Sequence, residues 1–126
     1  GSATRILGIS VDRPRDAVAA DVASLASQGA ALLGADWRID ARDILIDDGY
    51  RGDGYAVIGE PEREVIALLA RTEGILLDPV YTGRAMADLI DLIRQGTFAS
   101  SERVLFWHTG GVPALFAFPG DLEGAF

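Results

Sequence analysis

The feature that most constrains the fold is an alternation of short apolar runs with longer segments of helical periodicity. The runs typical of strands cover residues 4–10, 43–47, 75–77 and 104–107. The segments with apolar residues at helical spacing cover residues 14–33, 61–73, 83–95 and 112–118. Strands that alternate with helices tend to pair in parallel. This order therefore predicts an α/β fold of three layers, a mainly parallel sheet with helices on both faces.

Proline and glycine mark the expected ends of the helices. Pro14 and Pro61 suit the first turn of a helix, where the N–H group that proline lacks has no helical partner. Gly34, Gly74 and Gly96 follow the last apolar residue of three helices, and glycine readily takes the left-handed conformation that closes a helix. We expect a single α/β unit over residues 1–126, without internal repeats or linkers.

The composition excludes several classes of function. A formal net charge of -8 leaves no basic surface for a phosphate backbone, so nucleic acid is not expected as a partner. No apolar run approaches the roughly 18 residues that span a bilayer, so we expect no membrane segment and a cytoplasmic protein. With no cysteine and one histidine, the chain cannot form a disulfide or a thiolate zinc site, and no metal site is expected.

The absence of lysine removes one further kind of chemistry. All 11 basic residues are arginines, so no lysine amine is available to bind a carbonyl compound covalently. Any reaction that needs such an amine must take it from a polypeptide segment other than these 126 residues.

Three loops lie where ligands gather in α/β proteins, beyond the carboxyl ends of strands. These loops cover Gly8–Pro14, Asp78–Gly83 and His108–Gly111. The second and the third place a threonine beside a glycine at a strand-to-helix switch. We therefore expect the hydroxyls of Thr82 and Thr109 to project into one shared crevice.

Each of these side chains also has an ordinary structural interpretation. A threonine before a helix is most often an N-cap, which applies to Thr82 and Thr109. Tyr55 and Tyr81 are of a type that more often packs with a solvated hydroxyl than acts as an acid or base. His108, next to an apolar run, is typical of a hydrogen-bonded structural histidine. These residues alone leave the alternatives open.

Longer motifs around these loops resemble a known family. The sequences TEGILLDPVYTGRAMADLIDLI and VLFWHTGGVPALFAF are similar to the C-terminal part of the D-cysteine desulfhydrase and 1-aminocyclopropane-1-carboxylate deaminase family. Its members are pyridoxal-phosphate enzymes of the tryptophan-synthase-β fold, fold type II. The resemblance extends upstream through GYRGDGYAV and TRILGISVDRP, and so covers nearly all of the chain.

The resemblance implies roles for five residues. Tyr55 and Tyr81 map to two active-site tyrosines near the substrate and the coenzyme ring, and are expected to be catalytic. Thr82, Thr109 and Gly110 are expected to bind pyridoxal 5'-phosphate. The small domain of the family, its Schiff-base lysine and its glycine-rich phosphate loop belong to the family's chain upstream of this sequence. The present chain alone is therefore expected to be inactive.

The two threonines also favour one branch of the family. The deaminases resemble one another in having glutamate at the position of Thr82 and a leucine-like residue at that of Thr109, whereas the desulfhydrases have threonine at both. A hydroxyl beside the pyridine nitrogen supports a less electron-withdrawing ring than a carboxylate does. The resemblance therefore implies α,β-elimination from a β-substituted amino acid, as in D-cysteine desulfhydrase, which yields pyruvate, ammonia and hydrogen sulfide.

Other functions stay open beside this one. They are deamination of 1-aminocyclopropane-1-carboxylate, a sulfo-lyase reaction on cysteate, and a non-catalytic α/β module that complements a separate lysine-bearing chain. The complete enzyme is expected to be a homodimer that acts on a small amino acid. Arg84 stands where the family usually has lysine, and its side chain is expected to face solvent or a phosphate.

Overall fold

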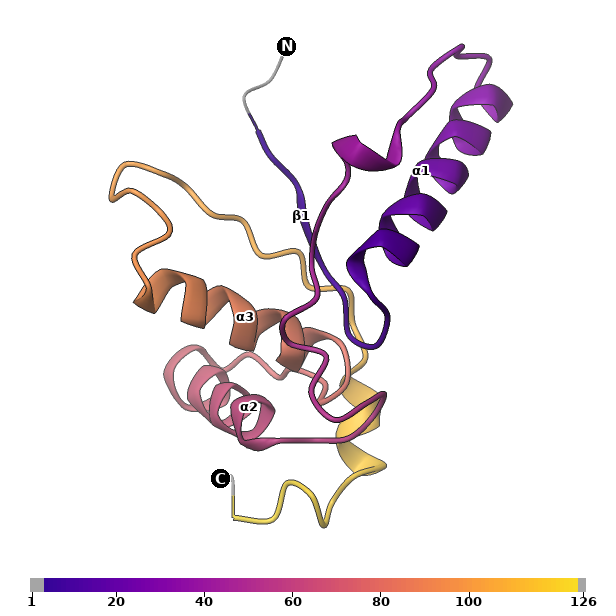
Figure 1. Ribbon diagram of the computed structural model, residues 1–126. Helices are drawn as coiled ribbons and strands as arrows, with labels where there is room; N and C mark the ends of the chain where they lie inside the picture. The colour runs from indigo at the N-terminus through magenta and orange to yellow at the C-terminus, as the bar shows by residue number, and fades with distance from the viewer. Residues whose placement is uncertain (1–3, 125–126) are drawn as a thin grey trace.

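The computed structural model describes residues 4–124 (Figure 1). Its elements in chain order are β1 (Leu7–Ile9), α1 (Arg15–Leu32), the 3₁₀ helix η1 (Ala41–Asp43), β2 (Leu45–Asp47), α2 (Glu60–Glu73), α3 (Thr82–Arg94) and the 3₁₀ helix η2 (Val112–Phe116). The three α-helices begin and end within one residue of their predicted bounds. The expected last helix over 112–118 is instead the short 3₁₀ helix η2.

The two strands form a parallel pair, as predicted for an α/β chain. Leu7 lies opposite Leu45 and Ile9 opposite Asp47, and the N–H of Ser10 continues the ladder to the carbonyl of Asp47 at 2.7 Å. α1 packs on β2 and α3 packs against β1. Figure 1 shows α1 on one side of the strands and α3 on the other, which is the layered order expected from the sequence.

Two of the four predicted strands are absent from the sheet in the part of the chain that the structure describes. Residues 75–77 and 104–107 run without a strand ladder, and the sheet there has only β1 and β2. A strand needs a neighbour for its N–H and C=O groups. The carbonyl of Leu76 instead meets the imidazole Nε2 of His108 at 3.0 Å, and Leu105 is exposed.

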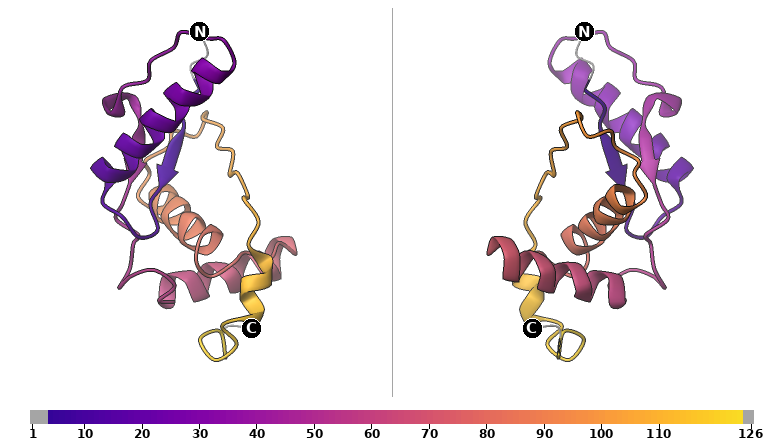
Figure 2. Two further views of the ribbon diagram at one scale, coloured as in Figure 1. Left: turned by 90° about the vertical axis from the view of Figure 1, so that its right-hand side faces the viewer. Right: turned by 90° about the vertical axis from the view of Figure 1, so that its left-hand side faces the viewer.

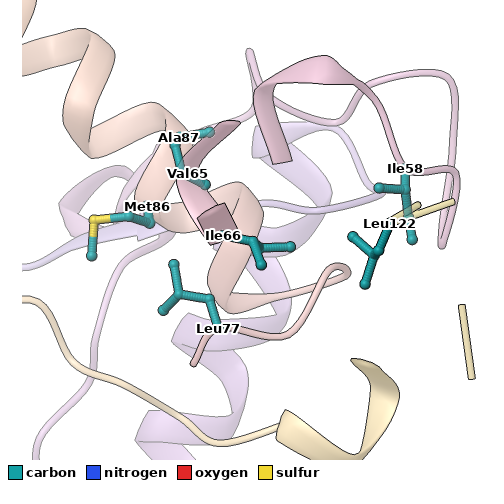
Figure 3. Close-up of a cluster of buried hydrophobic side chains, with 7 residues drawn as sticks. All are labelled: Ile58, Val65, Ile66, Leu77, Met86, Ala87 and Leu122. Carbon is teal, nitrogen blue, oxygen red and sulfur yellow. The ribbon is translucent and has the colours of Figure 1, made fainter. Parts of the chain in front are cut away.

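α2 and α3 form the centre of the buried core (Figure 3). The buried cluster consists of Ile58, Val65, Ile66, Leu77, Met86, Ala87 and Leu122. α2 is closed by Gly74, whose φ of 67° lies in the left-handed region, as its position after the helix predicts. The segment that leads from α2 to α3 therefore starts at Gly74.

α1 has a different surface. Two further views place it apart from the α2–α3 pair (Figure 2). Its buried side chains are alanines, at positions 19, 23 and 30, whereas Leu25 is 67% exposed and Leu32 is 89% exposed. No helix within residues 4–124 combines the length and apolarity that a bilayer crossing requires.

Candidate functional site

The two predicted catalytic tyrosines lie side by side. The phenol oxygens of Tyr55 and Tyr81 are 2.5 Å apart, which is a short hydrogen bond in which either group can be the donor. Their ring centroids are 6.0 Å apart and the ring planes meet at 65°, an edge-to-face arrangement. Tyr55 is 55% exposed and Tyr81 47% exposed, so both phenols are open to a ligand.

The phenol of Tyr81 holds its proton more tightly than an ordinary tyrosine. The hydrogen bond with Tyr55, and then partial burial, raise its pKa, and the carboxylates of Asp78 and Asp12 act in the same direction. At neutral pH the phenol of Tyr81 therefore keeps its proton. It can donate a hydrogen bond or a proton, but it is not a phenolate.

Asp78 organises the turn that carries Tyr81. Its Oδ1 accepts hydrogen bonds from the N–H groups of Val80 (2.8 Å) and Tyr81 (2.7 Å), and its Oδ2 accepts from the N–H of Thr82 at 2.7 Å. Burial raises the pKa of Asp78, but the Thr82 hydroxyl and these backbone N–H groups lower it more, so it lies below the ordinary value. The carboxylate thus caps α3 in place of an N-cap side chain.

Thr82 differs from the expectation that it projects into a crevice with Thr109. Its side chain is buried, its hydroxyl donates to Oδ2 of Asp78 at 2.6 Å, and the N–H of Asp78 donates to Oγ1 at 2.8 Å. The hydroxyl proton is therefore used within the turn. Because Asp78 supplies the stronger acceptor, the structural interpretation of Thr82 as part of a helix cap describes its geometry best.

The loop from His108 to Gly111 is fixed against the same turn at two points. The N–H of Gly110 donates to Nδ1 of His108 at 3.1 Å, so Nε2 carries the ring proton and donates it to the carbonyl of Leu76. At Gly111 (φ 95°) an added Cβ would lie 2.7 Å from Cγ of Asp78. Thr109 lies between these contacts and is exposed, so its hydroxyl remains open.

Arg84 does not face solvent or phosphate, and that expectation was wrong. The side chain is 1% exposed, and its Nε donates to Oε1 of Glu62 at 2.8 Å. The remaining nitrogens donate to four carbonyl oxygens, at distances between 2.5 and 2.8 Å, those of Val11, Arg51, Gly54 and Val57. The guanidinium is buried because its planar fork of donors satisfies all of these acceptors at once.

Asp88 is a further buried acidic residue that the sequence did not reveal. It lies on α3 with 0% exposure, and neither carboxylate oxygen has a hydrogen-bond partner. Burial, and then the charges of Asp47 and Asp91, raise the pKa of Asp88 to about 6. Within residues 4–124 no group of three or more potential metal ligands comes together, and Asp91 instead accepts a hydrogen bond from Tyr50.

Comparison with known proteins places the chain in a family. Residues 1–110 match the family described as pyridoxal-phosphate dependent enzymes. The chain belongs to this family. It is 38% identical over 118 residues to proteins named 1-aminocyclopropane-1-carboxylate deaminase from Burkholderia ambifaria (strain MC40-6) and from Ralstonia pickettii (strain 12J). The alignment covers 94% of this chain and 35% of each of those proteins.

The fold of this pyridoxal-phosphate family member is also found in a solved structure. A crystal structure of an ACC deaminase homologue matches with a TM-score of 0.80 and 32% sequence identity, over 95% of this chain and 35% of the other. The chain therefore spans about a third of the length of the relatives it matches. The fold class, the resemblance and the coenzyme expected from the sequence are confirmed at this level.

The described side chains fit one part of the coenzyme. A pyridine ring with a ring nitrogen can stack on, or hydrogen-bond to, the exposed phenols of Tyr55 and Tyr81, and the free hydroxyl of Thr109 can meet a ring nitrogen. Beside that hydroxyl, Gly110 leaves open space where a Cβ would stand. The chain has no lysine, so the covalent anchor has to come from other residues.

Three charged residues at the site were missed by sequence reasoning. Asp78 had a local signal, since an aspartate shortly before a helix often accepts N–H groups of the first turn. Glu62 and Arg84 had none, because they are 22 residues apart and each was compatible with an exposed helix face. The nearest indication of the environment of Arg84 is the glycine-rich segment 49–54, because its carbonyl groups need hydrogen-bond donors where water does not reach them.

Proposed function

We propose that this chain forms the phenol-bearing side of the coenzyme site in a pyridoxal-phosphate lyase that eliminates the β-substituent of a small amino acid. The observation that supports this most is the contact between Tyr55 and Tyr81. Thr109 exposes its side chain in the loop whose Gly111 packs against Asp78, the residue that organises the turn of Tyr81. Our leading reaction is that of a D-cysteine desulfhydrase. One D-cysteine and one water then give one pyruvate, one ammonia and one hydrogen sulfide.

The phenols have defined tasks in this reaction. When bound, pyridoxal phosphate supplies the electron sink that makes the Cα proton of an amino acid acidic. The phenols of Tyr55 and Tyr81 would orient the substrate, and that of Tyr81, which holds its proton, would donate it to the sulfur that leaves Cβ with the bonding electron pair. The hydroxyl of Thr109 would hold a ring nitrogen without adding a negative charge beside it. No residue of this chain is assigned to remove the Cα proton.

Deamination of 1-aminocyclopropane-1-carboxylate is the second candidate. It is favoured by the names of the relatives from Burkholderia ambifaria and Ralstonia pickettii. The residues of this chain favour elimination instead, since neither Thr82 nor Thr109 brings a carboxylate to the ring. In both cases we propose a small amino acid as substrate and a homodimer as the complete enzyme.

The decisive assay combines the chain with the lysine-bearing polypeptide of the enzyme and pyridoxal phosphate. Sulfide released from D-cysteine and ammonia released from 1-aminocyclopropane-1-carboxylate are then measured side by side. We expect sulfide release to dominate, and we expect Tyr55→Phe and Tyr81→Phe to lower it about 100-fold each. The control is Tyr50→Phe, because the phenol of Tyr50 bonds Asp91 and neither of the two tyrosines, and its loss should leave turnover nearly unchanged.

The outcomes separate the alternatives. Dominant ammonia release would replace the elimination with the deaminase reaction. Coenzyme binding without turnover of either compound would favour the non-catalytic module. The chain alone should show no turnover and no lysine-linked coenzyme after borohydride treatment, because it contains no lysine. In the coenzyme-loaded protein, Thr109→Glu should alter the visible absorption spectrum, and an unchanged spectrum would contradict contact with the ring.

A further inference from the structure

A single nitrogen of Arg84 donates hydrogen bonds to the backbone on both sides of Tyr55. Its Nη2 donates to the carbonyl of Gly54 at 2.8 Å and to that of Val57 at 2.5 Å, one residue before and two residues after the tyrosine. Its Nη1 donates to the carbonyl of Arg51 at 2.7 Å, at the start of the same turn. The guanidinium therefore holds both ends of the segment that carries the phenol.

This segment needs an external support. Gly52 has a φ of 57° and Gly54 a φ of 136°, and Ala56 has a φ of 59°, the only positive value of a non-glycine residue among residues 4–124. An alanine in the left-handed backbone conformation is strained, and it persists only when contacts with the surrounding structure hold it there. The backbone bonds inside the turn are weak, since the N–H of Val57 lies 3.4 Å from the carbonyl of Gly54.

Arg84 also ties this turn to the helix that presents the other phenol. Arg84 is the third residue of α3 and follows Tyr81, the N-cap residue, by three positions. Glu62 of α2 neutralises the guanidinium through Oε1, while its Oε2 accepts the N–H of Gly59 at 2.8 Å. One cation thus links the turn of Tyr55, the start of α2 and the start of α3.

We infer that Arg84 is a positioning residue, which sets the contact between the phenols of Tyr55 and Tyr81 through the carbonyls of residues 51–57. The catalytic consequence of this role rests on the function proposed above, but the geometric role does not. A merely structural Arg84 would only cross-link α2 and α3 through Glu62. Lysine can keep that ion pair with its single ammonium, but it cannot also reach the carbonyls on both sides of Tyr55.

The test uses the 126-residue chain with its tyrosines labelled at the Cζ carbon, since it has only three. Carbon NMR then follows each phenol as the pH rises. In the unsubstituted chain, Tyr81 should titrate above an ordinary phenol, and a nuclear Overhauser contact should connect the rings of Tyr55 and Tyr81. In Arg84→Lys we expect the ring contact to be lost and the titration of Tyr81 to return toward the ordinary value.

Two controls keep the result specific. Tyr50 should titrate identically in both chains, because its hydroxyl bonds Asp91 and not the turn. Arg94→Lys changes an exposed pair with Glu64 between the same two helices, and should leave the ring contact and the titration of Tyr81 unaltered. Neither control requires bound coenzyme, so failure of the proposed reaction would not imitate failure of this inference.

The inference is overturned if folded Arg84→Lys keeps both the ring contact and the raised titration of Tyr81. If Arg84→Lys does not fold, the double variant Glu62→Gln with Arg84→Gln decides. Its neutral amides can bond each other across α2 and α3, but they leave the carbonyls near Tyr55 without the fork of donors. Loss of the ring contact in that folded variant supports positioning, and its retention contradicts it.

Discussion

α1 and the α2–α3 pair use their apolar residues in opposite ways. The α2–α3 pair and the segment that joins the two helices bury Val65, Ile66 and Leu77, each at 2% exposure or less. α1 buries only alanines and leaves Leu25 and Leu32 largely exposed. Helical periodicity locates both helices equally well, but burial decides which side chains contribute to the free energy of unfolding. The two regions should therefore respond very differently to similar substitutions.

The largest contrast should come from the charged residues. Arg84→Met leaves Glu62 buried without its partner, and we expect the free energy of unfolding to fall by about 3–5 kcal/mol. Arg13→Met removes an exposed pair with Asp21 beside α1, and its effect should be too small to resolve. Urea unfolding of both variants measures the difference. Equal losses would show that burial does not separate the two regions.

Truncation of leucines should give the next largest effect. Leu77→Ala opens a cavity in a fully buried site and should cost about 3 kcal/mol. The same substitution at Leu25, which is exposed on α1, should change the urea midpoint little. A large effect at Leu25 would mean that this face of α1 is covered in solution, and the comparison would have to be revised.

Asp88 should make the α2–α3 pair sensitive to pH. Its pKa is raised in the folded state to about 6, so the unfolded chain releases this proton at a lower pH. The folded state is thus favoured most below about pH 4, and stability is lost as the pH rises toward 6. Asp88→Asn should remove this loss and stabilise the chain by about 2 kcal/mol at pH 7.

The control for this pH dependence lies on α1. Asp16→Asn removes one exposed carboxylate in the first turn of α1, and so measures how much of the change in the profile of thermal unfolding comes from net charge alone. If Asp88→Asn has the same profile as the unsubstituted chain, the buried carboxyl does not carry the proton that the structure assigns to it.

Substitutions at two glycines should give the smallest changes in stability, and the two changes should have opposite signs. Gly74 closes α2 in the left-handed region, so Gly74→Ala should destabilise the chain by about 1 kcal/mol although space is free around it. Gly29 lies inside α1 with nothing within 4 Å of an added Cβ, so Gly29→Ala should stabilise it by up to about 1 kcal/mol. Thermal unfolding distinguishes the signs, and equal signs would contradict the assigned backbone conformations.

The sequence predicted the parts of the fold that depend on local structure. The ends of α1, α2 and α3 follow from the periodicity of the apolar residues and from prolines and glycines that lie within one turn of a helix end. Residues 75–77 and 104–107 are apolar like strands, but a ladder depends on a neighbour and not on the segment itself. The sequence pattern therefore predicted α1, α2 and α3 correctly, a longer last helix than the 3₁₀ helix η2, and two strands that form no ladder among residues 4–124.

The sequence predicted the candidate site only at residues that belong to a motif of the family. The resemblance singled out Tyr55 and Tyr81, and the structure places their phenols in contact across 26 residues. The environment of Arg84 could not be read from its neighbours in sequence, because its partners lie 22 to 73 residues away. For Thr82 the partner is local instead. The resemblance assigned its hydroxyl to the coenzyme, but that hydroxyl donates a hydrogen bond to Asp78, four residues earlier.

The hydrogen bond between the two phenols has a stoichiometric consequence. Each hydroxyl has one hydrogen, and one of the two lies between the oxygens, so the pair always presents one outward hydrogen. Either ring can present it, and a rotation of both hydroxyls exchanges the roles without moving a heavy atom. A bound molecule can thus accept a hydrogen bond from either ring, and the position of its own acceptor atom decides which phenol donates.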